Sequence, residues 1–259
     1  MATITTEQVK ELRDQTGVSV MQCKKALEEA EGDMEKALLI LKKKSTEIAA
    51  KKSDREATAG YIAKAEKSGT GLVLALKCET DFVAKNADFI AIAQNLANIV
   101  LEKGKEEAQK AAPDLISTGI QKLGENIQLD EIVSISAPTT GVYVHDGRIG
   151  IVVGLSAGES SLAKDIAMHI AAMNPEYKVR ADVPTDAVEK VRAMFEEEVK
   201  NSGKPADIQE KMLSGKIDTF FKERTLMDQS FIKNPDLTIE KLLNQAKANL
   251  VDFARVSVS

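Results

Sequence analysis

The sequence contains no tryptophan, only two cysteines and only 4% aromatic residues over its 259 positions. So few aromatic side chains beside 29% charged residues favour a helix-rich protein over a β-sandwich. The two thiols, Cys23 and Cys78, fall in different predicted units, which argues against a disulfide framework and against a zinc site. This cysteine usage is typical of a reducing cytosol, so we expect a cytoplasmic protein.

Long apolar runs are also missing, since no stretch reaches the roughly 18 apolar residues of a membrane-spanning helix. The first four residues lack the basic and apolar regions of a secretory signal peptide. We therefore expect neither export by that route nor a membrane partner. A formal net charge of −5 argues against wholesale binding of a nucleic acid backbone, so no direct nucleic-acid partner is expected.

Recognisable catalytic chemistry is scarce. No Gly-x-x-x-x-Gly-Lys-Ser/Thr phosphate loop occurs. The two histidines are His145, expected to be exposed near a hairpin tip, and His169, expected to be structural on a helix. Neither has a cysteine nearby for a metal site, and Glu79 and Asp81 lie two apart in one loop, a spacing that predicts no acid/base pair. The sequence therefore predicts a protein that is not an enzyme, with no cofactor and no metal.

Residues 1–42 carry the start and stop signals of three short helices. Thr5 and Ser19 each begin a capping box with the glutamine three residues later, and Asp33 caps a third helix. Glycines end the first two helices. Cys23 falls on the apolar stripe of the second helix, so we interpret it as a small buried hydrophobe rather than a reactive thiol. This pattern predicts a three-helix bundle.

A basic segment, residues 42–55, follows the predicted bundle and loses the large apolar residues. Its lysines and arginine predict either a linker or an exposed helix that separates the bundle from the rest of the chain. We interpret the charges as a solvated face rather than a nucleic-acid site. Together with the length of the chain, this segment indicates more than one structural unit.

A weak internal repeat follows, in which a β-hairpin, a loop and an amphipathic helix occur in residues 61–97 and again in residues 143–171. Asp146-Gly147 is a strong hairpin signal in the second copy. Duplicated β-β-α units predict two similar α+β subdomains, each with a small antiparallel sheet covered by helices on one face. The chain between the copies is predicted to hold a helix and a strand, near residues 102–123 and 130–136.

The loop of the first copy, residues 77–86, places an aromatic ring where polar residues are usual. Two interpretations of Phe82 are open: the ring plugs the top of its own core, or it is an exposed anchor for a partner. The loop of the second copy, residues 157–161, is small and polar. Because a ring needed to complete the fold would have an apolar counterpart there, we favour the exposed anchor.

Residues 185–200 and 206–224 predict two antiparallel helices joined by a turn that contains Gly203 and Pro205. Such a narrow arm cannot cover all its apolar surface alone, which makes it a candidate for self-association or partner contact. Packing of the arm on its own domain is the simpler alternative. After the arm, a helix and a strand that extends the second sheet are predicted near residues 238–249 and 252–258.

Several motifs occur in a fixed order along nearly the whole chain. They are Leu-Arg-Asp-Gln-Thr-Gly at 12–17, Cys-Lys-Lys-Ala-Leu at 23–27, Gly-Asp-Met-Glu-Lys-Ala at 32–37, Cys-Glu-Thr-Asp-Phe-Val-Ala-Lys-Asn at 78–86, Arg-Ile-Gly at 148–150 and His-Ile-Ala-Ala-Met-Asn-Pro at 169–175. In this order they resemble the elongation factor Ts family. The resemblance implies a guanine nucleotide exchange factor for the translational GTPase elongation factor Tu.

The resemblance also implies an α+β architecture: an N-terminal three-helix ubiquitin-associated-like bundle, two similar core subdomains with small antiparallel sheets, and a protruding antiparallel helical hairpin. The implied units are residues 1–54 for the bundle with its basic linker, 55–140 for the first core subdomain, 141–180 plus 225–259 for the second, and 181–224 for the hairpin. Longer relatives continue into an extra C-terminal helix, from which we expect no contribution here.

Carried over by position, Asp81 and Phe82 would enter the partner, with the ring wedged between side chains of its GTPase domain near the magnesium and phosphate site. Leu123 and Gly124 would support that contact. The partner-binding residues implied in this way are Thr80, Asp81, Phe82, Val83, Leu123, Gly124, Arg13, Val20, Met21 and His145.

Two further contacts are implied by the resemblance. Arg13, Val20 and Met21 would lie where the N-terminal bundle meets the GTPase domain, and His145 would face another domain of the partner. Gln22 stands where the family usually has aspartate, so that local contact differs. The competing interpretation is an interaction scaffold or holdase that uses the arm and the bundle without exchanging nucleotide.

Overall fold

The N-terminal part of the chain is a three-helix bundle in the computed structural model, which describes residues 4–258. The predicted helix starts are confirmed, because the side chains of Thr5, Ser19 and Asp33 each accept a backbone N–H of the first turn. At Ser19 the reciprocal half of the predicted box is replaced by a hydroxyl bond to the glutamine side chain. Cys23 is fully buried, as predicted. The helices are α1 (Thr6–Thr16), α2 (Val20–Glu29) and α3 (Met34–Lys52).

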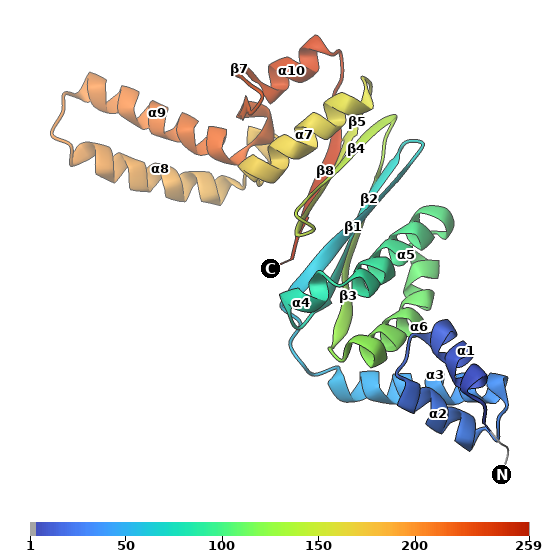
Figure 1. Ribbon diagram of the computed structural model, residues 1–259. Helices are drawn as coiled ribbons and strands as arrows, with labels where there is room; N and C mark the ends of the chain where they lie inside the picture. Colours follow the sequence, from blue (N-terminus) through green and yellow to red (C-terminus); the bar gives the residue numbers. More distant parts are fainter. Residues whose placement is uncertain (1–3, 259) are drawn as a thin grey trace.

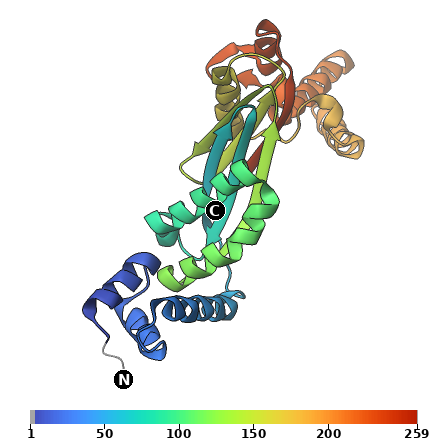
Figure 2. The ribbon, with the colours of Figure 1, turned by 90° about the vertical axis from the view of Figure 1, so that its right-hand side faces the viewer.

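Helix α3 continues well beyond the predicted end of the bundle. It runs unbroken to Lys52, so the basic segment is an extension of this helix rather than a linker. One face of the extension packs on α6: Ser45 is buried with its hydroxyl 3.4 Å from that of Ser117, and Lys42 Nζ lies 2.6 Å from Asp114 Oδ2. Figure 2 shows the two helices side by side. α3 therefore belongs to the bundle and to the core at once.

The first sheet is antiparallel with the order β1-β2-β3, and helices α5 and α6 cover one of its faces (Figure 1). Its first two strands form the predicted hairpin, closed by a tight turn at Ser68 and Gly69. The elements are β1 (Ala59–Lys67), β2 (Thr70–Cys78), α4 (Asp81–Ala84), α5 (Ala87–Lys103), α6 (Lys105–Leu123) and β3 (Ile127–Ser136).

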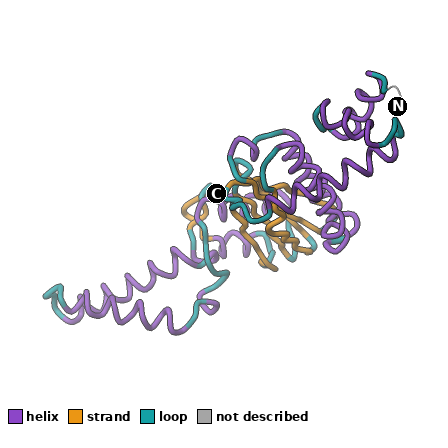
Figure 3. The backbone as a smooth tube through the Cα atoms, turned by 90° about the horizontal axis from the view of Figure 1, so that it is seen from below, coloured by secondary structure: helices purple, strands orange, loops and turns teal. Residues whose placement is uncertain are grey.

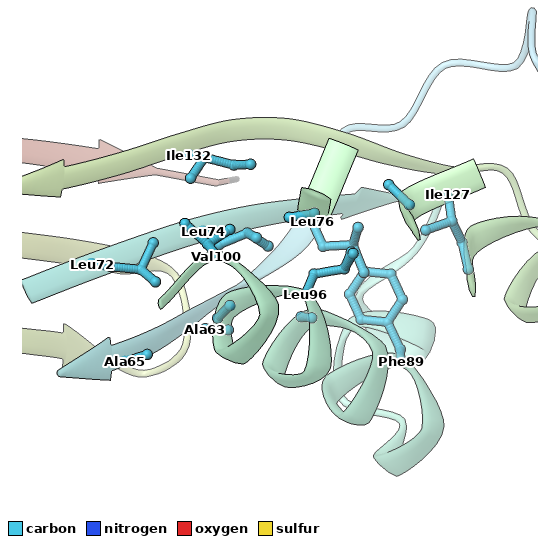
Figure 4. Packing of buried hydrophobic residues seen from close by; sticks show 14 of the residues in the cluster. Ala63, Ala65, Leu72, Leu74, Leu76, Phe89, Leu96, Val100, Ile127 and Ile132 are labelled. Carbon is cyan, nitrogen blue, oxygen red and sulfur yellow. The ribbon is translucent and has the colours of Figure 1, made fainter. Parts of the chain in front are cut away.

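Strand β2 is buried on both faces, which accounts for its unbroken apolar run. Leu72, Leu74 and Leu76 point toward α5, where they belong to one cluster with Phe89 and Leu96 (Figure 4). The alternate residues of β2 belong to a second cluster on the opposite face. Because side chains alternate along a strand, one central strand supplies both cores.

The second sheet repeats the plan of the first, with the order β4-β5-β8 and helices α7 and α10 on one face. The predicted hairpin at Asp146-Gly147 joins its first two strands, and the predicted C-terminal strand pairs with β5. The fold is α+β, as predicted. The elements are β4 (Thr139–His145), β5 (Ile149–Leu155), α7 (Ser160–Met173), α10 (Ile239–Gln245) and β8 (Leu250–Ser257).

The two sheets pack against each other through the faces that the helices leave open. Val73 and Ala75 of β2 meet apolar residues of the second sheet there. Gly150 permits the close approach, since a Cβ at this position would lie 2.6 Å from Ile62 Cγ2 and 3.0 Å from Val73 Cγ1. The backbone N–H of Ile62 also donates to the carbonyl of Gly147 at 2.7 Å. This helix–sheet–sheet–helix layering was not predicted.

The arm is the predicted antiparallel pair, α8 (Thr185–Lys200) and α9 (Ala206–Arg224). It projects from one end of the molecule, opposite the N-terminal bundle (Figure 3). Val199 is the one residue of the two helices that is buried, so the arm does not pack along its length on its own domain and contacts it only at its base. None of the described helices combines the length and the apolarity needed to cross a membrane.

Short elements connect the arm to the second sheet, and none of them was predicted. Two 3₁₀ turns lie at the base of the arm, and a two-stranded ribbon follows the second of them. The bounds are Arg180–Asp182 and Leu226–Asp228 for the turns, and Ser230–Phe231 (β6) and Asn234–Thr238 (β7) for the ribbon.

Candidate functional site

The segment predicted as an irregular turn after β2 contains one turn of helix. β2 extends to Cys78, and α4 then spans Asp81–Ala84. Thr80 is its N-cap, with an extended backbone and with Oγ1 accepting the Val83 N–H at 3.4 Å. A threonine cap followed by an acidic residue in the first turn favours a helix start. The predicted turn is therefore corrected to a capped helical turn.

The side chain of Phe82 is 84% exposed, the highest value of any large hydrophobic residue described. Its neighbours face the other way: Ala84 is buried and Val83 is half-buried against the first core. The aromatic ring that fills this core is Phe89, which is fully buried. The interpretation of Phe82 as a core plug is wrong. The ring lies at the surface, where it leaves unused about 1.5–3 kcal/mol of hydrophobic free energy available on burial.

A carboxylate from a distant segment holds the backbone just before α4. Glu125 Oε2 accepts hydrogen bonds from the backbone N–H groups of Glu79 at 3.1 Å and Thr80 at 3.0 Å. Glu125 Oε1 accepts the Thr80 hydroxyl proton at 2.6 Å. Glu125 lies between α6 and β3, 45 residues beyond Thr80. Bonds to an ionised acceptor are about twice as strong as neutral ones, so this loop fixes the backbone that leads into α4.

The same two loops are also joined in the reverse direction. Glu79 Oε1 accepts the backbone N–H of Asn126 at 2.6 Å, and the buried Asn126 side-chain amide donates to the Arg55 carbonyl at 2.6 Å. At the end of α3, the Lys52 ammonium donates to the Gly124 carbonyl. The end of α3, the β2–α4 loop and the α6–β3 loop therefore form one hydrogen-bonded network.

Leu123 and Gly124, which were expected to support Phe82, lie within this network. Leu123 ends α6 and packs half-buried against the first core. Gly124 is exposed and adopts a left-handed conformation with φ of 81°, which ends the helix. The structure thus brings both residues close to the start of α4, because they directly precede Glu125.

The buried thiol beneath α4 is structural. Burial raises the pKa of Cys78 to about 12, and the nearby charge of Glu125 adds to this effect. The protonated Sγ donates to the Thr80 carbonyl at 3.2 Å. Within residues 4–258, no group of three or more histidine, cysteine, aspartate or glutamate side chains is placed to hold a metal ion. Cys78 thus contributes a hydrogen bond to the backbone that leads into α4.

Helix α4 lies beside the β4–β5 turn of the second sheet. The hydrogen bond from Lys85 Nζ, 3.0 Å from Asp81 Oδ2, lowers the pKa of Asp81, and Arg148 lowers it further. Asp81, Lys85, Asp146 and Arg148 line a surface cavity of about 250 Å³ whose wall includes the ring of Tyr61. α4 therefore presents an ionised carboxylate beside an exposed aromatic ring.

His145 lies at the tip of this same hairpin, and its side chain is 55% exposed, as predicted. Its Nδ1 is 3.1 Å from the Tyr143 hydroxyl, and its Nε2 is 3.6 Å from Asp146 Oδ2. The other histidine, His169, is fully buried, which confirms its structural assignment. The hairpin that carries His145 thus adjoins α4, although the two copies of the repeat are far apart in sequence.

The N-terminal bundle carries the remaining predicted contacts. Val20 and Met21 are 52% and 67% exposed at the start of α2, and Arg13 is exposed at the end of α1. Figure 1 shows this part of the bundle apart from α4. Lys122 of α6 lies against the end of α1 and forms an ion pair of 2.7 Å with Asp88 of α5. Arg13, Val20 and Met21 thus lie on a second exposed surface, apart from that of Phe82.

No role was predicted from the sequence for Glu125, Asn126 or Arg148. Only one local signal marks the first two, which directly follow the left-handed glycine that ends α6. Arg148 follows the Asp-Gly turn, and its closeness to Asp81 depends on how the two sheets pack. Residues of this kind are found only when distant segments have been placed together.

Comparisons with known proteins show the family to which this chain belongs. The sequence profile of the family described as "Elongation factor TS" matches residues 79–259, which is more than half of the chain. The chain belongs to the elongation factor Ts family. An elongation factor Ts from Marinobacter nauticus is 40% identical over 100% of this chain and 92% of its own length. An elongation factor Ts from Saccharophagus degradans is 42% identical over 96% of this chain and 89% of its own length.

Membership of this family confirms the resemblance found in the ordered motifs. A third relative, the elongation factor Ts of Alkalilimnicola ehrlichii, is 40% identical over 96% of this chain and 90% of its own length. The chain therefore belongs among the factors of translation elongation, in protein biosynthesis. The profile match begins at Glu79, in the β2–α4 loop.

Proposed function

We propose that this chain is a guanine nucleotide exchange factor that binds elongation factor Tu with GDP and promotes GDP release. Asp81 and Phe82 enter the GTPase domain of that partner near its magnesium and phosphate site. The observation that carries the proposal is the 84% exposure of Phe82 on a helical turn that a hydrogen-bonded network holds in place. Membership of the elongation factor Ts family supports the choice of partner.

The proposed mechanism needs no catalytic residue. GDP in such a GTPase is held by a phosphate loop at a helix N-terminus and by a magnesium ion. A ring inserted beside them weakens many charge-assisted contacts together, and burial of the ring on the partner offsets about 1.5–3 kcal/mol of the distortion. Because exchange couples two ligands of one protein, GDP weakens the binding of this chain by the same factor as the chain weakens that of GDP.

Other residues extend the proposed contact. Gly124 and Leu123 support the Phe82 side, His145 faces another domain of the partner, and the N-terminal bundle contacts the GTPase domain through Arg13, Val20 and Met21. The exposure of Val20, Met21 and His145 supports this assignment. We further propose the bundle, the two core subdomains and the arm as the structural units of the chain, with the boundaries given above. We also propose that the chain acts in the cytoplasm.

The test measures release of fluorescent GDP from elongation factor Tu, with and without this chain. We expect the wild-type chain to accelerate release and Phe82→Ala to lose most of the acceleration. Val251→Ala is the matched control, because Val251 is also an exposed apolar residue, at 45%, but lies on β8. Equal release with and without the wild-type chain would contradict the proposal. Binding without acceleration would support the scaffold interpretation instead.

A second proposal concerns the arm, which we propose as a surface for self-association. A groove of about 660 Å³ between α8 and α9 is lined by Phe195, Met212 and Phe220, and Met194 on its wall is 57% exposed. Lys216 and Glu223 give the groove charges of both signs. A surface with both signs of charge can be self-complementary about a two-fold axis, so a second copy of the arm is the proposed occupant.

Analytical ultracentrifugation tests the arm. We expect the wild-type sedimentation coefficient to rise with concentration and Met194→Glu to abolish the rise, because it places a charge in the apolar groove. Lys190→Glu is the control, since Lys190 lies on the same helix, is highly exposed and does not line the groove. A wild-type coefficient that stays constant with concentration would contradict self-association.

A further inference from the structure

We propose that Glu125 is a positioning residue for exchange, which fixes the direction of α4 and thereby the place of the Phe82 ring. The inference rests on the exchange function proposed above. Glu125 does not touch the partner in this proposal and acts only through Glu79 and Thr80 of the β2–α4 loop. Its three hydrogen bonds to the β2–α4 loop carry the inference.

The first step concerns the hydroxyl of Thr80. A hydroxyl has one proton to donate and two lone pairs that accept. The Thr80 proton goes to Glu125 Oε1 at 2.6 Å, because an ionised carboxylate only accepts. A lone pair of Thr80 Oγ1 is then free to accept the Val83 N–H at 3.4 Å. Glu125 therefore orients the cap from which α4 begins.

The second step concerns the weakness of α4 on its own. The helix has four residues, fewer than an isolated helix needs for stability, and Ala84 is its one buried residue. Phe82 contributes nothing to packing inside the chain, since its ring is exposed. The cap and the bonds that lead into it therefore add to the packing of Ala84 and Val83 in constraining the direction of the ring.

The third step shows that Glu125 is itself held from both sides. Gly124, which precedes Glu125, caps α6, and its carbonyl accepts a hydrogen bond from the Lys52 ammonium. Asn126, which follows Glu125, is 2% exposed. Asn126 donates its backbone N–H to Glu79 and its side-chain amide to Arg55. Glu125 is thus a fixed acceptor on a rigid frame, as a residue that positions another segment must be.

The absence of tryptophan gives a direct readout, because Phe82→Trp would place the only indole of the chain at the ring itself. We expect Glu125→Ala in the Phe82→Trp background to lower the fluorescence anisotropy of this indole. Glu102→Ala is the control, because Glu102 is exposed on α5. Unchanged anisotropy in a folded Glu125→Ala protein would overturn the proposal. This measurement needs no partner, so it decides the role of Glu125 even if the exchange function fails.

A double-mutant cycle gives the functional readout. We expect Glu125→Ala, which removes all three hydrogen bonds to the β2–α4 loop, to lower the maximal rate of GDP release about tenfold. In the Phe82→Ala background the same change should have almost no further effect, because there is no ring to position. An equal loss in both backgrounds would overturn the proposal, since Glu125 would then act independently of Phe82.

Glu125→Gln keeps the experiment decisive if the alanine variant fails to fold. The amide oxygen can still accept the two backbone N–H groups, but without the charge, and the amide nitrogen no longer accepts the Thr80 proton. We expect a loss smaller than that of Glu125→Ala, confined to the background that retains Phe82. Full wild-type anisotropy and exchange in this variant would show that the ionised carboxylate is dispensable and would overturn the proposal.

Discussion

His169 Nε2 and Gln229 Oε1 lie 3.0 Å apart in the buried core between α7 and the base of the arm. His169 Nδ1 accepts the backbone N–H of Ile232 at 3.3 Å, so the hydrogen-bond network assigns the proton to Nε2. Gln229 in turn donates to the carbonyl of Glu223 at 3.0 Å. A neutral imidazole therefore links α7 to the last turn of α9.

This link predicts a pH dependence of stability. Burial lowers the pKa of His169 below its ordinary value of 6.5, against an opposing effect of the Gln229 hydrogen bond. A proton on Nδ1 would face the Ile232 N–H, so the charged form is disfavoured in the folded state. The contribution of neutral His169 to the stability of the fold is present above pH 6.5. It is lost as the pH falls below this value, because the histidine of the unfolded chain binds a proton first. Thermal unfolding of wild type and His169→Gln between pH 7.5 and about 5.5 should show a smaller decrease for the variant.

The base of the arm predicts a second effect. The guanidinium of Arg180 lies 2.9 Å from Asp218 and 2.8 Å from Asp228, and stacks 5.0 Å from the centre of the Phe221 ring. Arg180→Lys should loosen the arm and destabilise its base by about 1 kcal/mol, since one ammonium cannot replace the planar fork. Amide hydrogen exchange in α9 should accelerate. Arg192→Lys should leave that exchange unchanged, because Arg192 pairs with Glu196 of its own helix, α8.

The packing of the two sheets predicts opposite effects for two glycines. Gly150→Ala should destabilise the protein by about 1–3 kcal/mol, since the new methyl group would meet Ile62 and Val73 in a closed interface. Gly215→Ala should stabilise it by about 0.5–1 kcal/mol, because its Cβ meets nothing within 4 Å on helix α9. Urea unfolding measures both. A destabilised Gly215→Ala, or a neutral Gly150→Ala, would contradict the described packing.

Two aromatic residues seven positions apart should behave differently in the same assay. Phe82→Ala should change the free energy of unfolding by less than about 0.5 kcal/mol, because its ring is exposed. Phe89→Ala should cost about 3–5 kcal/mol, because its ring is fully buried between β2 and α5. Chemical denaturation of both variants separates a surface ring from a core ring. A large loss at Phe82 would return it to the core.

Local features of the fold were readable from the sequence because their signals are local. The caps at Thr5 and Asp33, the Asp146-Gly147 turn and the prolines before the arm helices act within a few residues. The helix bounds of the arm agree with the prediction for the same reason. Comparison of the two copies of the repeat also indicated that Phe82 is exposed, since the matching loop of the second copy has no apolar residue in its place.

Other features depend on segments that only the folded chain brings together. α4 has four residues, too few for a periodic pattern. Glu125 and Thr80 are 45 residues apart, with no spacing rule between them. In the sequence, Gly150 looks like an ordinary glycine of a strand. Its need to be small follows only from the packing of the first sheet against it. The exposed ring of the candidate site was therefore predicted from the sequence. The residues that hold the ring in place were not.

Helix α3 sets a fixed distance within the molecule. Its 19 residues form a rod about 28 Å long at 1.5 Å per residue, with the N-terminal bundle at one end and the Lys52–Gly124 bond at the other. For a partner that contacts the bundle and Phe82 together, the rod acts as a stiff linker. Binding of the partner at one surface then raises the effective concentration of the second surface near its own contact. The resulting gain in affinity depends on the distance between the two surfaces. A glycine inserted in the middle of α3 would reduce this avidity without removing any contact residue.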